Sequence, residues 1–178
     1  PDQPLQVQRR EYILDLRDFP GSPYADKFVK EFSLVRDDSE IEVVVECIGG
    51  THPAFDFVKA CLENKKSVVS SNKELIATKG AELLRIAKEN GVNLFFEGSV
   101  GGGVPIIRPM NQCLAANEIK EIAGIVNGTT NFILTKMVRE GMSFEDALNK
   151  ALDLGYAEKA DQSADIDGID ACRKICIL

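Results

Sequence analysis

Residues 41–50 read Ile-Glu-Val-Val-Val-Glu-Cys-Ile-Gly-Gly, a β-branched run that ends at two glycines. Short apolar runs of this kind are typical of strands buried on both faces of a parallel sheet. Thr51 and Pro53 follow at once, and both favour the first turn of a helix, so we expect a helix from there to about Lys65. The stretch therefore predicts a buried strand followed by a crossover helix.

The same alternation continues on both sides of this unit. We predict strands over 12–16, 67–70 and 92–97, helices around 24–32 and 80–90, and a turn at Ser71-Asn72-Lys73. Strands joined in this way by helices require a parallel sheet with right-handed crossovers. Residues 1–98 are therefore predicted to form an α/β domain, a partial doubly wound (Rossmann-like) sheet of the nucleotide-binding kind. No G-x-G-x-x-G fingerprint follows the first strand.

The pattern changes after residue 98. A glycine-rich bend over 99–105 leads to a predicted helix up to about 115, a strand over 118–126, and helices over 130–140 and 143–154. Ser143 and Asp146 form a capping-box signal at the start of the last of these. We expect residues 99–178 to be the start of a second, α+β domain.

Composition narrows the classes of function. A net charge of −7 argues against nucleic acid or an anionic membrane as the partner, and no apolar run approaches the ~20 residues of a membrane span. The five cysteines are odd in number and dispersed, which predicts buried thiols in a reducing cytoplasm. Because His52 is the only histidine, catalysis must depend on Lys, Asp, Glu or a cofactor rather than on a Ser-His-Asp triad.

Asp170 and Lys174 are four residues apart, so they share one face of a predicted helix that is otherwise largely apolar. An amine beside an apolar surface and a carboxylate is a candidate proton carrier. The alternative is an ordinary ion pair between consecutive turns of a helix.

Two predicted strand ends carry a second group of candidates. Gly49-Gly50 ends one strand and Ser71-Asn72-Lys73 ends the next, and ligands of open parallel sheets bind outside these carboxyl ends. Glycine lets a flat ring approach the backbone, and lysine can hold a phosphate, a ribose or a substrate carboxylate. The alternative is that these residues only satisfy loop geometry.

Glu97 and the bend at 100–104 form a third candidate site. A carboxylate beside backbone carbonyls suits a hard cation such as Na⁺ or Ca²⁺. The same bend could instead offer amides to an anion at the start of the next helix, or act only as a hinge between domains.

The order of five sequence blocks resembles the homoserine dehydrogenase family over about residues 11–178. The blocks are Val45–Gly50, Ser71–Leu75, Glu97–Pro105, Val126–Asn131 and Gly155-Tyr156-Ala157-Glu158 with Asp165–Asp170 and Lys174. The resemblance implies an oxidoreductase that interconverts L-homoserine and L-aspartate 4-semialdehyde with NAD or NADP, in threonine, methionine and isoleucine biosynthesis. It also implies a cytoplasmic homodimer, in which residues 1–98 bind NAD(P) and residues 99–178 serve substrate binding, catalysis and dimerisation.

The resemblance further implies roles for single residues. Lys174 matches the catalytic proton donor, and the substrate-binding carboxylates would be Glu158, Asp170 and Asp165. The cofactor would contact Gly49, Gly50, Lys73 and Gly155. A monovalent cation, usually Na⁺, would bind the Glu97 side chain and the carbonyls of Val100, Gly102 and Val104.

The chain departs from the family pattern in three respects. The glycine-rich fingerprint is missing, the sequence ends at Leu178, and the segment between Glu158 and Asp165 is one residue longer, with Gln162 where a proline is expected. We therefore expect a fragment of such an enzyme. One alternative is a non-catalytic nucleotide-binding and dimerisation module. Another is a semialdehyde dehydrogenase of similar build, which would need a cysteine nucleophile beside His52.

Overall fold

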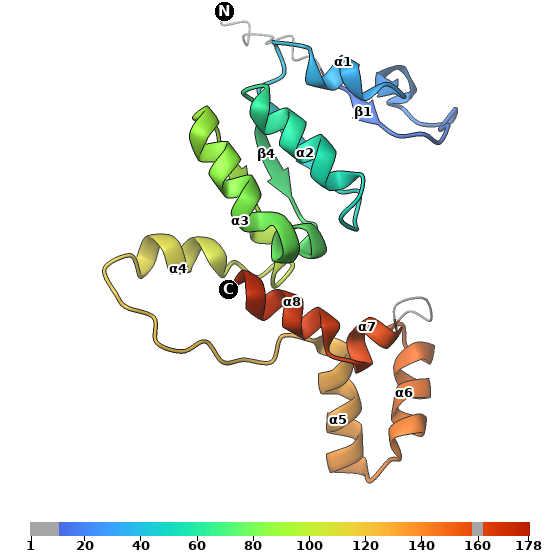
Figure 1. The fold of residues 1–178 in the computed structure, drawn as a ribbon. Coiled ribbons are helices and arrows are strands. Elements are labelled where there is room, and N and C mark those ends of the chain that lie inside the picture. Colours follow the sequence, from blue (N-terminus) through green and yellow to red (C-terminus); the bar gives the residue numbers. More distant parts are fainter. Residues whose placement is uncertain (1–10, 158–161) are drawn as a thin grey trace, which may run out of the picture. The chain divides into compact units, whose positions relative to one another are not determined.

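The computed structural model describes residues 11–157 and 162–178, and these residues form two compact units (Figure 1). The first unit contains the described residues up to Ser70 together with Lys79–Phe95, and the second contains Ser71–Thr78 and the described residues from Phe96 to Leu178. Helix α3 (Lys73–Asn90) therefore contributes residues to both units. The predicted domain boundary between residues 98 and 99 stays a prediction.

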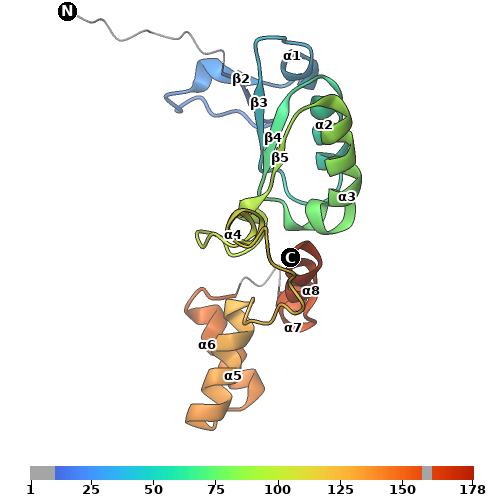
Figure 2. The same cartoon turned by 90° about the vertical axis from the view of Figure 1, so that its left-hand side faces the viewer.

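The first unit contains a three-stranded parallel sheet with the order β3-β4-β5, formed by Val43–Glu46, Ser67–Ser70 and Leu94–Phe95. Helix α2 (Ala54–Glu63) connects β3 to β4, and α3 connects β4 to β5. Both helices lie on the same side of the sheet (Figure 2). The predicted α/β architecture with crossover helices is thus confirmed.

A second parallel pair joins β1 (Ile13–Leu14) to β2 (Phe28–Val29), with Ile13 opposite Phe28. The predicted helix over 24–32 is therefore wrong, because the chain forms the 3-10 helix η1 (Ala25–Lys27), then β2, and then α1 (Phe32–Arg36). Pairing with β1 satisfies the backbone of Phe28–Val29 in place of a helix, and the Phe28 ring also stacks on Phe19 at 4.9 Å.

Among the described residues, only one face of β3 is covered, so the prediction of a strand buried on both faces is wrong. Val43 and Val45 are 56% and 66% exposed, whereas Glu46 is 4% exposed. The helices pack on the face that carries Val44, Val68 and Leu94, which are aligned across the three strands. The core of this face comes from α2 and α3, through Val58, Cys61, Leu62, Leu83, Ile86 and Ala87.

The prediction of buried thiols holds for only one cysteine. Cys61 lies in the core of the first unit, and burial raises its pKa to about 11. Cys47, Cys113, Cys172 and Cys176 are exposed. Cys47 is the residue directly after β3. Cys172 and Cys176 lie on the side of the last helix that faces away from Asp170, because residues two positions apart on a helix point in nearly opposite directions.

The second unit is mainly helical. After η2 (Glu97–Ser99) and α4 (Ile107–Cys113), α5 (Gly128–Glu140) and α6 (Phe144–Asp153) form a hairpin, followed by α7 (Gln162–Ile166) and α8 (Ile169–Ile177). Ile133, Ala147 and Ala151 form the buried core of the hairpin. The two predicted helices and the Ser143 cap are confirmed, since the Ser143 hydroxyl accepts the Asp146 N–H at 3.1 Å.

The predicted strand over 118–126 is wrong. Residues 118–125 are exposed and have no regular secondary structure, and no strand in the described part of the chain pairs with them. Apolar alternation alone does not make a strand, because the backbone N–H and C=O groups need a neighbouring strand. None of the described helices is both long enough and apolar enough to cross a membrane.

Candidate active site

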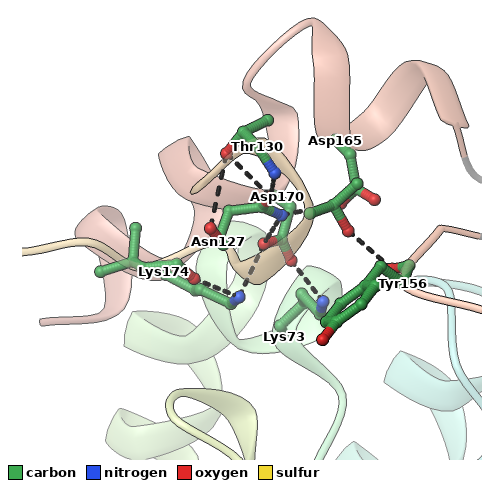
Figure 3. Close-up of polar contacts among 9 residues, drawn as sticks. Lys73, Asn127, Thr130, Tyr156, Asp165, Asp170 and Lys174 are labelled. Atoms are coloured by element: carbon green, nitrogen blue, oxygen red, sulfur yellow. Dashed lines mark hydrogen bonds and ion pairs between the residues drawn. The ribbon is translucent and has the colours of Figure 1, made fainter. Parts of the chain in front are cut away.

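Asp170 lies at the centre of a cluster of polar side chains in the second unit (Figure 3). It is near the start of α8 and is only 5% exposed. Asn127 Nδ2 and Lys174 Nζ donate to its Oδ2 at 2.9 and 2.6 Å, and Lys73 Nζ donates to its Oδ1. The buried carboxylate therefore has three donors, two of them cations.

These donors decide the protonation state of Asp170. Burial raises the pKa of this carboxyl, but hydrogen bonds from Lys174, Lys73 and Asn127 together outweigh burial and lower the pKa to about 2. Asp170 is thus ionised at neutral pH. The buried anion attracts both ammonium groups through charge-assisted hydrogen bonds, and the loss of either lysine would leave its charge less well compensated.

Lys174 lies one turn beyond Asp170, and its side chain is 17% exposed. Its Nζ donates to Asp170 Oδ2 and to the Val126 carbonyl, both at 2.6 Å. The predicted pairing on one helix face is present, and it belongs to a larger network than an isolated ion pair. An ammonium group has three N–H bonds, so one remains for a further acceptor.

Lys73 reaches Asp170 from the start of α3. The predicted start of this helix is wrong, because α3 begins at Lys73, within the predicted turn at Ser71-Asn72-Lys73, rather than near Gly80. The Asn72 side chain accepts the Leu75 N–H at 3.1 Å and so caps this helix. The Lys73 side chain is 43% exposed, which leaves it accessible to a ligand.

A second ion pair joins the same two helices, since Glu74 lies 2.8 Å from Arg173 of α8.

The structure adds Asn127 to the site, a residue to which the sequence patterns assigned no role. Its side-chain amide donates to Asp165 Oδ1 at 2.7 Å as well as to Asp170. Its Oδ1 accepts the Thr130 N–H at 2.8 Å, which caps α5. The signal available in the sequence was a typical helix start, asparagine followed after three residues by threonine. That signal indicates a cap but not the contact with two carboxylates.

The predicted cofactor loop at Gly49-Gly50 belongs to the first unit. Both glycines have positive φ angles, +81° and +69°, a conformation that a residue with a Cβ rarely adopts. The buried Glu46 carboxylate accepts the Ile48 N–H at 2.7 Å and the Ser70 hydroxyl at 2.5 Å. One side chain thus ties the turn to the carboxyl ends of β3 and β4.

Glu97 contacts backbone amides at the start of α4. Its Oε1 accepts the N–H groups of Ile106 and Ile107 at 2.5 and 3.0 Å, and its Oε2 accepts that of Arg108 at 2.7 Å. The Ile106 N–H, followed by those of Arg108 and Ile107, lowers the pKa of Glu97 against the opposing effect of burial. The amides at the start of α4 thus bind an anion, which is this protein's own carboxylate. In the described residues no group of three or more His, Cys, Asp or Glu side chains is placed to hold a metal, so a cation here would depend on backbone carbonyls.

The remaining predicted positions are distributed as follows. Val100 is buried and Val104 is 67% exposed, and the turn between them has positive φ at Gly101 and Gly102. Gly155 takes φ +75° directly after α6, as the residue after a helix commonly does. Glu158 lies outside the described residues.

His52 is exposed on the first unit, and its Nδ1 lies 3.6 Å from Asp56 Oδ2, which is also exposed. This arrangement is an ordinary exposed pair four residues apart, with His52 just before α2 and Asp56 in its first turn. It gives no support to a semialdehyde dehydrogenase that uses a cysteine and a histidine.

A parallel sheet with crossover helices on it is the architecture of a class: the nucleotide-binding α/β proteins. Family sequence profiles narrow that class. The one described as "Homoserine dehydrogenase, NAD binding domain" matches residues 9–97, and the one described as "Homoserine dehydrogenase" matches residues 105–178. The chain belongs to the homoserine dehydrogenase family.

Individual relatives agree with this assignment. The homoserine dehydrogenase of Bacillus subtilis (strain 168) is 49% identical over 144 residues, which are 81% of this chain and 33% of the relative. The crystal structure of a homoserine dehydrogenase from Thiobacillus denitrificans superposes with a TM-score of 0.78 at 46% identity, over 83% of this chain and 34% of the other. A hyperthermophilic archaeal homoserine dehydrogenase in complex with NADPH gives 0.75 at 39% identity, over 83% and 45%. The chain thus spans about a third of the length of the curated relatives it matches.

Proposed function

We propose that this chain is the part of an NAD(P)-dependent homoserine dehydrogenase that carries the proton-transfer site. The observation that supports this most is the position of Asp170 between Lys73 and Lys174. The reaction class requires a proton donor for an oxygen that becomes an alkoxide, with positive charge near it. Lys174 meets both needs, since its ammonium group is mostly buried and retains one N–H beyond its two protein acceptors.

In the reducing direction, Lys174 donates a proton to the oxygen of the aldehyde as that oxygen gains negative charge. Asp170 and the Val126 carbonyl hold the amine while this occurs. In the oxidising direction the same amine, once deprotonated, removes the proton of the homoserine hydroxyl. Lys73 adds a second positive charge next to Asp170, and its exposed end suits contact with a carboxylate or a phosphate.

The substrate ammonium needs a carboxylate that is not already saturated by lysines. Asp165 Oδ1 accepts one hydrogen bond, from Asn127, and its other oxygen has no partner among the described side chains. Asp165 is therefore well suited to bind an ammonium group, and Asp170 retains acceptor capacity on Oδ1 beside Lys73. We propose that Glu158 completes this set.

The residues of the cofactor loop fit a nicotinamide cofactor. Gly49 and Gly50 have positive φ angles, and apart from their chain neighbours no atom lies within 4 Å of the point where a Cβ would stand at either residue, so a flat ring would meet no side chain there. When bound, NAD or NADP supplies or accepts the hydride. Glu46 holds the loop in this shape. Lys73 and Gly155 are the further cofactor contacts that we propose.

We also propose a monovalent cation at Glu97, with the carbonyls of Val100, Gly102 and Val104. Among the described residues, Glu97 Oε2 accepts one amide hydrogen, that of Arg108, so it retains a lone pair for a cation. Sodium dependence of the full-length enzyme tests this site. Activity that rises with Na⁺ in the wild type and does not respond to Na⁺ in Glu97→Gln supports it, whereas equal responses contradict it.

Homoserine oxidation by the full-length polypeptide, measured separately with NAD and NADP, tests the proposed function. Lys174→Ala should lower kcat roughly 10²–10⁴-fold, the usual range for a positioned acid. Lys150→Ala, which removes an exposed lysine from α6, is the matched control and should retain wild-type kcat. A wild-type protein without homoserine-dependent activity would favour the non-catalytic module. Unchanged kcat in Lys174→Ala would remove the role of that lysine.

The oligomeric state is a separate proposal. We propose a homodimer, which is supported by the family resemblance. Light scattering of the full-length protein decides it, since a monomeric mass contradicts the proposal.

A further inference from the structure

We infer that Asn127 is a positioning residue whose one side-chain amide fixes Asp165 and Asp170 with respect to Lys174. This inference rests on the proposed function and deepens it. The contacts are Asn127 Nδ2 to Asp165 Oδ1 at 2.7 Å and to Asp170 Oδ2 at 2.9 Å (Figure 3). The two N–H bonds of a single NH₂ group therefore connect two carboxylates that come from α7 and α8.

The orientation of this amide is fixed by Thr130. Its N–H and its hydroxyl both donate to Asn127 Oδ1, at 2.8 and 2.9 Å. Turning the amide over would place a carbonyl oxygen against two carboxylates and an NH₂ group against two donors. Because all four hydrogen-bonding positions of the amide are used in one orientation only, and Asn127 is 8% exposed, the NH₂ group must face the carboxylates.

The residue before Asn127, Val126, contacts Lys174, the cation of the Asp170–Lys174 ion pair. The Val126 carbonyl accepts from Lys174 Nζ, while Asn127 donates to the Asp170 oxygen that also binds Lys174. Two consecutive residues therefore hold the amine and its carboxylate. A displacement of this dipeptide would disturb both the proton donor and the proposed substrate carboxylates.

Two functions of Asn127 can be separated by substitution. The residue caps α5 through its oxygen and connects the carboxylates through its nitrogen. Serine and aspartate cap helices about as well as asparagine, but neither has an NH₂ group. Asn127→Ser thus keeps the cap and removes the connection. Asn127→Asp keeps the cap and adds a third carboxylate to a site where Lys73 and Lys174 are the facing cations and Asp165 and Asp170 the facing anions.

The experiment uses the full-length enzyme with both variants and Ser143→Ala, which removes the cap of α6 away from this cluster. We expect Asn127→Ser to lower kcat roughly 10–100-fold, the scale on which small misplacements of reacting groups act. The KM for homoserine should rise while that for the cofactor stays near wild type. Asn127→Asp should lose more activity. Ser143→Ala should lower the melting temperature with kcat unchanged.

Titration of the Asp170 carboxyl by ¹³C NMR gives a readout that does not depend on activity. Its midpoint should rise in Asn127→Ser and by about one unit or more in Asn127→Asp, because a donor is lost and a like charge is added. The inference is overturned if both variants keep kcat and KM within twofold of wild type, or if the Asp170 midpoint does not move in either. A wild-type enzyme without homoserine oxidation would overturn the proposed function instead, and the NMR comparison would still show whether Asn127 connects the two carboxylates.

Discussion

Asp170 carries its charge in a place where water contributes little, so its three donors supply the stabilisation. Its pKa of about 2 lies below the ordinary 3.8, which means that the folded state binds this proton less tightly than the unfolded state. The resulting stability is fully present above about pH 4 and is lost as the pH falls towards 2. We expect it to be worth roughly 1–2 kcal/mol, allowing for screening by solvent.

Urea unfolding of wild type and Asp170→Asn between pH 6 and 3 measures this term. The wild type should lose stability over that range more steeply than the variant, because the variant has no carboxyl to protonate at this position. Parallel curves would show that the folded pKa of Asp170 is ordinary.

The same substitution should lower kcat/KM by more than tenfold, since it leaves Lys73 and Lys174 without their shared anion.

At Glu97 the carboxylate accepts three consecutive amides at the start of α4. Glu97→Gln replaces one acceptor oxygen by an NH₂ group that cannot accept the Arg108 N–H. Hydrogen exchange of residues 106–108 should therefore become faster, by about tenfold for one lost hydrogen bond. Residues of α6, which Glu97 does not contact, serve as the internal reference. Unchanged exchange at 106–108 would show that these amides do not depend on Glu97.

Single residues of the site differ in how far the sequence could predict them. The spacing of Asp170 and Lys174 places both on one face of any helix, so their pairing was predictable. Lys73 is 97 positions from Asp170 along the chain, and only folding brings the two together. Asn127 was missed for a different reason. A helix cap explains its presence fully at the level of local sequence, and the second use of its amide is a tertiary contact.

Helix α5 shows how an element divides its apolar residues between core and solvent. Ile133 is 1% exposed and packs on α6, whereas Val138 on the same helix is 83% exposed. Ile133→Ala should cost about 2–5 kcal/mol of unfolding free energy, through lost burial and the cavity left behind. Val138→Ala should change it by less than about 0.5 kcal/mol. Chemical denaturation of both variants measures the difference in unfolding free energy. Equal effects would mean that Ile133 is not part of the hairpin core.

Helices and strands were predictable where the local sequence pattern agrees with the tertiary contacts that the element makes. Strand β4, helix α6 and its Ser143 cap follow from alternation, periodicity and capping residues. The errors occurred where a partner decides the outcome. Phe28–Val29 pairs with β1 instead of continuing a helix, residues 118–126 have no strand beside them in the described part of the chain, and β3 has helices on one face only. The late start predicted for α3 is a different error, because Asn72 was interpreted as a turn residue rather than as a cap.

The molecule as a whole divides within a helix rather than between two elements. Residues 73–78 of α3 group with the second unit, and residues 79–90 group with the first. The contacts of the first segment include the ion pairs from Lys73 and Glu74 to Asp170 and Arg173 of α8, beside the buried side chains of Leu75 and Ile76. A continuous helix opens from an end when its terminal contacts are removed. The two segments should therefore respond differently to changes in α8.

Hydrogen exchange of α3 in the full-length protein tests this division. Asp170→Asn should increase the exchange rate of residues 73–78 by tenfold or more, about the effect of 1.4 kcal/mol, and should leave residues 79–90 within about twofold of wild type. Arg85→Gln is the matched control, because it removes an exposed ion pair with Glu89 from the other part of the same helix. That variant should change exchange little in either segment, since exposed pairs contribute little. Equal acceleration along the whole of α3 in Asp170→Asn would mean that the helix opens as one body and belongs to a single unit.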